Sequence, residues 1–160
     1  MTYYIGVDPG KNGAYASIDA EGKFVEVGNF YVENNRVHSE TLYWKLHCYG
    51  DESIKIITEQ VNSRAGNSMP SVFNFGVTCG RIWGVCELFY NNLIYVLPQK
   101  WKKHFDLLKT KEQSVAEGKE LCRLKAIELF PEAADKLKRK KDHDRAEALL
   151  IARYAWENKL

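Results

Sequence analysis

Residues 3–10 read YYIGVDPG, an aromatic and β-branched run that ends in a turn. This pattern predicts a strand over Tyr3–Val7 that stops at Asp8. The strand pattern resumes at Ala14–Ile18, which predicts a hairpin, and a third strand is expected over Phe24–Phe30. Three consecutive strands joined by short turns indicate an antiparallel meander.

The rest of the chain alternates between helical and strand patterns. A helical period over 37–49 precedes a buried strand at Ile54–Thr58, which has Glu59 at its end, and 60–70 is expected as a loop. The order βββαβαβ followed by helices predicts the α/β class, with a mixed five-stranded sheet flanked by helices. The remaining elements are expected as helices at 71–90, 99–105, 112–130 and 145–159 and a strand at Leu93–Leu97.

The composition is that of one globular domain over residues 1–160. The chain is 45% hydrophobic and 28% charged, and no apolar stretch approaches the roughly 20 residues that a membrane span requires. Its four cysteines form no C-x-x-C pair, so we expect them to be reduced and to form no disulfides. These features predict a cytoplasmic protein without a membrane partner.

Four acidic residues lie where elements end or begin. Asp8 and Glu59 end two predicted strands, and parallel neighbouring strands would bring both to one edge of the sheet. Asp144 and Glu147 are three residues apart at the start of the last helix, so they share one face of it. Four carboxylates in one place repel one another and attract cations, and hard oxygen ligands suit Mg²⁺ or Mn²⁺.

Each acid also has a purely structural explanation, and Glu59 at its strand end could simply be solvated. Asp8 is followed by Pro-Gly and fits a turn, while Asp144 with Glu147 fits a helix cap. Asp142 lies about 140° from Glu147 around a helix and Asp144 only about 60°, which favours Asp144 as the third ligand. His143 and Asp142 nevertheless crowd this position, so any of the three neighbouring side chains remains a candidate.

Together these motifs resemble the RuvC-like Holliday-junction resolvases, especially the phage-encoded members. The resemblance implies an RNase H-like fold, a homodimer, and cleavage of branched DNA, in particular four-way junctions, with two Mg²⁺ or Mn²⁺ ions per active site. A phage-encoded member would act in the cytoplasm of a bacterial host. Asp8, Glu59, Asp144 and Glu147 match the family's four acids, although an aspartate is more usual where this chain has Glu147. The segments that carry the resemblance are 5–10 with Gly13, 58–59, 73–76 with Gly80, 98–103 and 144–152.

Two other functions remain open. The first is an RNase H-like nuclease for another substrate class, such as RNA–DNA hybrids. The second is a branched-DNA binder without catalytic activity. All four carboxylate positions are filled, which argues against the second.

Basic residues concentrate in the last third of the chain. Residues 98–160 contain 16 basic and 11 acidic residues, whereas residues 1–97 contain 7 and 10. Such side chains suit a path of phosphates, although a solvated helix face gives the same pattern. Lys119 resembles the family's phosphate-contacting lysine, and Arg64 lies in a loop that the resemblance places at the junction centre. The expected DNA contacts are Arg64, Lys100, Lys102, Lys103 and Lys119.

Glycines recur every four residues on the predicted helix 71–90, at Gly76, Gly80 and Gly84. Such a face lets another backbone approach closely. That backbone is either the sheet of the same subunit or, as the resemblance implies, the same helix of a second copy. Two symmetric nicks require two active sites, so we expect a homodimer through this helix.

Overall fold

A mixed five-stranded sheet forms the centre of the computed structural model, which describes residues 2–50, 53–62 and 66–160. The strand order is β3-β2-β1-β6-β7. The pairs β1–β2 and β2–β3 are antiparallel, whereas β1–β6 and β6–β7 are parallel. The predicted sheet is thus confirmed. Its strands are β1 (Tyr3–Asp8), β2 (Ala14–Ile18), β3 (Phe24–Asn29), β6 (Ile54–Glu59) and β7 (Leu93–Val96).

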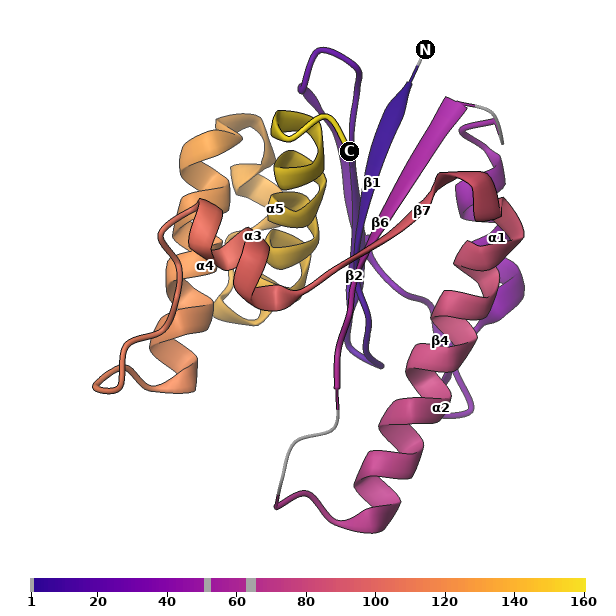
Figure 1. Cartoon of the computed structure of the whole chain (residues 1–160), viewed down its shortest axis with the longest axis horizontal. Coiled ribbons are helices and arrows are strands. Elements are labelled where there is room, and N and C mark those ends of the chain that lie inside the picture. Colours follow the sequence, from indigo (N-terminus) through magenta and orange to yellow (C-terminus); the bar gives the residue numbers. More distant parts are fainter. Residues whose placement is uncertain (1, 51–52, 63–65) are drawn as a thin grey trace.

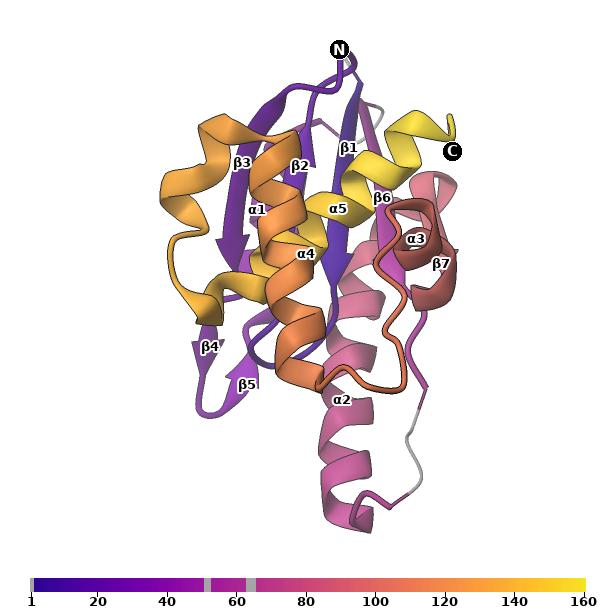
Figure 2. The ribbon, with the colours of Figure 1, turned by 90° about the vertical axis from the view of Figure 1, so that its left-hand side faces the viewer.

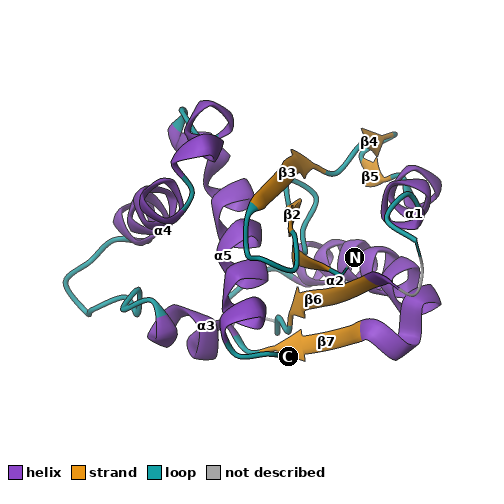
Figure 3. Cartoon of the chain, turned by 90° about the horizontal axis from the view of Figure 1, so that it is seen from above, coloured by secondary structure: helices purple, strands orange, loops and turns teal. Residues whose placement is uncertain are grey.

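Helices cover both faces of the sheet (Figures 1 and 3). On one face lie α1 (Ser39–His47) and α2 (Met69–Cys86). On the other, α5 (His143–Glu157) packs directly on β1 and β2, and α4 (Val115–Leu129) packs on the outer side of α5 (Figure 2). The short helix α3 (Pro98–His104) follows β7 and also contacts α5.

Capping residues set helix boundaries that the apolar period leaves undefined. α2 begins two residues before the predicted position 71, because the Ser68 hydroxyl accepts a hydrogen bond from the Ser71 amide, and it ends at Cys86. α4 begins at Val115 instead of residue 112, because Ser114 and Glu117 form a capping box. The helices predicted at 37–49 and 145–159 span Ser39–His47 and His143–Glu157.

Several short elements were not predicted, because two to six residues show no clear period. β4 (Val32–Glu33) and β5 (Arg36–Val37) form a small hairpin. Within the described ranges, 3₁₀ segments also occupy Glu87–Asn92, Pro131–Lys136 and Lys140–Asp142.

Alternation along the strands divides the interior into two cores. Ile5 and Val7 of β1 face α1 and α2, whereas Gly6, between them, faces α5. On β6, Ile56 faces α2 and Ile57 faces α5. Even-numbered residues of β1 and odd-numbered residues of β6 therefore point to the α5 side.

The cysteines and the helices give two further findings. Cys48, Cys79, Cys86 and Cys122, all within the described ranges, form no disulfide. In the part of the chain that the structure describes, no helix has the length and apolar character needed to cross a membrane.

Candidate active site

The sheet brings Asp8 and Glu59 next to each other. β1 and β6 run parallel with Val7 opposite Thr58, so the next residues along the two strands are Asp8 and Glu59. Both follow the alternation that points side chains toward α5. Asp8 is 8% exposed and Glu59 7% exposed, so both carboxyl groups are buried.

The first turns of α5 supply the other two acids. Glu147 is buried, and the Asp144 side chain is 21% exposed. The pKa of Asp8 lies well above its usual value, and burial is the largest cause. The negative charges of the other acids add to this effect, in the order Glu147, Glu59, Asp144. The structure therefore brings Glu59, Asp144 and Glu147 within electrostatic reach of Asp8.

Two lysines also enter the acid cluster. The Lys102 ammonium lies 3.7 Å from Glu147 Oε1. The Lys119 ammonium lies 2.8 Å from His143 Nε2, which in turn is 3.0 Å from Asp144 Oδ1. The four acids outnumber these two lysines, so full ionisation of the acids requires further cations.

His143 is held between these groups. Its Nδ1 lies 2.9 Å from the Lys140 carbonyl oxygen, which only accepts, so Nδ1 carries a proton. Burial raises the pKa of Asp144, while the neighbouring His143 and Lys119 act in the opposite direction. Nε2 of His143 therefore lies between the Lys119 ammonium and the Asp144 carboxylate.

Asp142, the alternative third ligand, has different partners. It accepts hydrogen bonds from the Arg139 backbone amide at 2.9 Å and from Arg139 Nη2 at 2.8 Å, and Arg145 lies 3.8 Å away. Burial acts to raise the pKa of Asp142, but the bonds from Arg139 outweigh it and the pKa is lowered. Two arginines therefore hold Asp142, which leaves Asp144 and His143 beside the cluster.

Side chains from α3 and α4 contact the acids in ways that the sequence pattern did not reveal. Trp101 donates a hydrogen bond from its indole Nε1 to Glu59 Oε1 at 3.0 Å. Burial, followed by the negative charge of Glu147, raises the pKa of Cys122 to about 12. Of these two contacts, only that of Trp101 could have been anticipated in part from the sequence, because a buried indole N–H requires a hydrogen-bond acceptor.

The chemistry of these donors fits a hard divalent cation. Three of the four carboxylates are buried and that of Asp144 is half-buried, and carboxylate oxygens are the hard ligands that such a cation prefers. As the side chains lie, however, no group of three or more His, Cys, Asp or Glu within residues 2–50, 53–62 and 66–160 is arranged to hold a metal ion. Glu147 is paired with Lys102, and Asp144 lies against His143. A metal ion would therefore have to replace Lys102 and His143 as the partners of these two carboxylates.

The other predicted DNA contacts lie at different depths. Lys100 and Lys103 are exposed on α3, whereas Lys102 and Lys119 are half-buried and reach the acid cluster. Arg64 falls outside the described residues. Lys102 and Lys119 are therefore the inner members of this set, and Lys100 and Lys103 are the outer, exposed ones.

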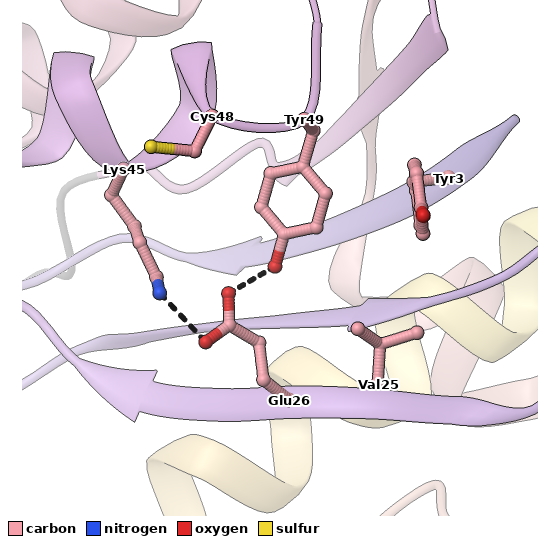
Figure 4. A pocket seen from close by; sticks show the side chains of 6 residues that line it. All are labelled: Tyr3, Val25, Glu26, Lys45, Cys48 and Tyr49. Carbon is pink, nitrogen blue, oxygen red and sulfur yellow. Dashed lines mark hydrogen bonds and ion pairs between the residues drawn. The ribbon is translucent and has the colours of Figure 1, made fainter. Parts of the chain in front are cut away.

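A separate hollow of about 330 Å³ lies between β3 and α1 (Figure 4). Its polar groups satisfy one another, because the Glu26 carboxylate accepts from the Tyr49 hydroxyl and pairs with Lys45 at 2.7 Å. The other lining residues are Tyr3, Val25 and Cys48. The hollow shares no lining residue with the acid cluster.

The raised pKa of Asp8 predicts that its negative charge destabilises the fold when no divalent cation is present. The protonated form favours the folded state, so this stability is complete below the unfolded pKa of about 3.9 and is lost as pH rises through the raised folded pKa. Without divalent ions, we expect Asp8→Asn to raise Tm at neutral pH by a few degrees, at ~2–4 °C per kcal/mol. The gain should shrink near pH 4, and calorimetric melting curves at both pH values measure it. A lower Tm for Asp8→Asn at neutral pH would contradict the prediction.

Comparison with solved structures identifies the fold. T. thermophilus RuvC in complex with Holliday junction substrate superposes with a TM-score of 0.68 and 14% sequence identity, covering 99% of this chain and 96% of that one. A Thermus thermophilus RuvC structure gives a TM-score of 0.58 and 15% identity over the same shares. No family model matches the sequence, and no curated protein matches it. Over nearly its whole length the chain therefore has the RuvC fold, a member of the RNase H-like class.

Proposed function

We propose that this protein is a metal-dependent endonuclease that nicks branched DNA and resolves four-way junctions by symmetric phosphodiester hydrolysis. The observation that carries the proposal is that Asp8 and Glu59 end adjacent parallel strands on the sheet face covered by α5, whose first turns carry Asp144 and Glu147. The likeness to RuvC bound to a Holliday junction supports the choice of substrate. Residues 1–160 would form one nuclease domain, acting in the cytoplasm of a bacterial host if the gene is phage-borne.

The acids would share the work by position. Two Mg²⁺ or Mn²⁺ ions would activate water and neutralise the leaving oxygen. Asp8 would serve both ions, and the charges of all three other acids acting on it support this role. Glu59 would hold one ion, and Asp144 with Glu147 the other. Lys102, now 3.7 Å from Glu147, would be released toward the incoming phosphate.

The lysines would guide the DNA to the acids. Lys100 and Lys103 are exposed on α3, and Lys119 lies at the inner end of the path beside His143. Phosphate contacts of this kind supply affinity that falls as salt rises. Arg64 is retained as a proposed contact from the loop that follows Glu59.

The glycine face of α2 supports a homodimer. A Cβ built at Gly76, Gly80 or Gly84 meets nothing within 4 Å, so this face does not pack on the subunit's own sheet. The N-terminal half of α2 extends past the sheet (Figure 2) and exposes Phe73 at 72% and Met69 at 86%. An apolar surface with room for close backbone approach suits a second copy of the same helix.

The dimer is tested by adding a charged side chain to this face. Gly80→Glu causes no clash within one subunit, so we expect a folded monomer where the wild type sediments as a dimer. Gly118→Glu on α4 is the matched control, because its Cβ also meets nothing within 4 Å, and it should remain dimeric. A monomeric wild type, or a dimeric Gly80→Glu variant, would refute this interface.

The function is tested with labelled substrates of different shape. We expect paired, symmetric nicks in a four-way junction in Mg²⁺ and none in EDTA, with far weaker cleavage of linear duplex. Replication forks and RNA–DNA hybrids complete the set. Preferential cleavage of the hybrid would favour an RNase H-like nuclease for RNA–DNA hybrids. Tight junction binding without nicks in Mg²⁺ or Mn²⁺ would favour a branched-DNA binder without catalytic activity.

A further inference from the structure

Two tryptophans hold consecutive side chains at the end of β6, one from each side of the sheet. From α2, Trp83 Nε1 donates to Thr58 Oγ1 at 3.0 Å. From α3, Trp101 Nε1 donates to Glu59 Oε1, also at 3.0 Å. The two hydrogen bonds are alike in donor and length, but only the second reaches an acid of the proposed active site.

The Trp101 indole is fixed in place. Its side chain is fully buried, within the core formed by α3, α4, α5 and the sheet. The indole N–H is a single donor with a fixed direction. A carboxylate oxygen that accepts from it loses rotational freedom, so this bond restrains the orientation of Glu59.

Trp101 also contacts Lys102, whose ammonium is paired with Glu147. The Lys102 ammonium lies 4.9 Å from the centre of the Trp101 ring and 3.7 Å from Glu147 Oε1. A cation over an aromatic face is attracted by the ring electrons. One rigid ring therefore sets the position of Glu59 through its edge and that of the Lys102–Glu147 pair through its face.

We propose that Trp101 is a positioning residue that orients Glu59 for divalent-cation binding. The inference rests on the function proposed above, because it requires Glu59 to be a metal ligand. Hydrogen bonds to a metal ligand from outside the coordination sphere commonly change metal affinity by about 10–100-fold.

Mn²⁺ affinity measured by titration calorimetry tests the proposal without any cleavage reaction. Trp101→Phe keeps an aromatic ring and removes the N–H, and we expect it to raise the Kd for Mn²⁺ about tenfold. Trp83→Phe is the matched control, since it removes the N–H that serves Thr58, and its Kd should stay within about twofold of wild type. Equal Kd values for Trp101→Phe and wild type, or equal losses in both variants, would overturn the proposal.

Glu59→Gln separates this inference from the proposed function. If wild type binds Mn²⁺ and Glu59→Gln does not, while Trp101→Phe binds as wild type does, the metal site stands and the positioning role fails. If wild type itself binds no Mn²⁺, both fail.

A measurement on the wild-type chain covers the case in which Trp101→Phe does not fold. In ¹⁵N spectra, the indole N–H signal of Trp101 should shift and reach saturation as Mg²⁺ is added, whereas that of Trp156, which donates to the Ala20 carbonyl, should not shift. An unmoved Trp101 signal at saturating Mg²⁺ would overturn the proposal.

Discussion

Asp8→Asn and Glu59→Gln are each expected to reduce junction cleavage in Mg²⁺ about a thousandfold or more, which corresponds to ~4 kcal/mol of transition-state stabilisation. Each change keeps the size of the side chain and removes a charge from a buried cluster whose members already interact. Junction binding should be unchanged or tighter, because one negative charge near the DNA phosphates is lost. Single-turnover cleavage and gel-shift titration on the same junction measure the two effects separately.

Asp142→Asn provides the control, because Asp142 is also a buried acid at the start of α5 but is held by Arg139 and Arg145. It should lower stability and leave cleavage within about threefold of wild type under conditions in which the variant is folded. Asp144→Asn should instead behave like Asp8→Asn. Normal cleavage by Asp8→Asn or Glu59→Gln would remove both from the active site.

Much of this site could be anticipated from β1 and β6 alone. Asp8 and Glu59 were expected at one sheet edge on the condition that their strands are parallel and adjacent, and the structure meets this condition. Strand alternation puts both on one face, and a helix spacing of three puts Asp144 and Glu147 together. These inferences succeed because they depend on local periodicity and on the general geometry of parallel sheets.

The contacts around the acids could not be anticipated in the same way. Trp101 and Glu59 are 42 residues apart, and no local pattern indicates that the indole of a short helix reaches back to β6. From the sequence, Lys102 was one of several lysines expected to contact DNA. In the structure its ammonium lies 3.7 Å from Glu147 Oε1. The sequence also could not decide whether the glycine face of α2 packs on the sheet or points away from it. This depends on which side of α2 the core residues Cys79 and Ile82 occupy.

Gly6→Ala is expected to be strongly destabilising. A Cβ at this position would lie 2.0 Å from the Ala148 carbonyl oxygen and 2.6 Å from the Ala152 amide nitrogen. Both are backbone atoms of α5, so the added methyl group must push the whole helix from the sheet. We expect a loss of ~3 kcal/mol or more in the free energy of unfolding, measured by urea titration.

The same displacement should weaken the acid cluster, because Glu147 lies one residue before the contact with Gly6, and Asp8 lies two residues after Gly6 on the same face of β1. Gly10→Ala is the control: its Cβ meets only the Gly13 amide nitrogen, at 3.8 Å, so the change should stay within about 0.5 kcal/mol. Where both variants are folded, Gly6→Ala should lose Mn²⁺ affinity and Gly10→Ala should keep it. A loss of less than about 1 kcal/mol for Gly6→Ala would mean that α5 does not pack directly on β1. The contact that brings the acids of α5 close to Asp8 would then be absent.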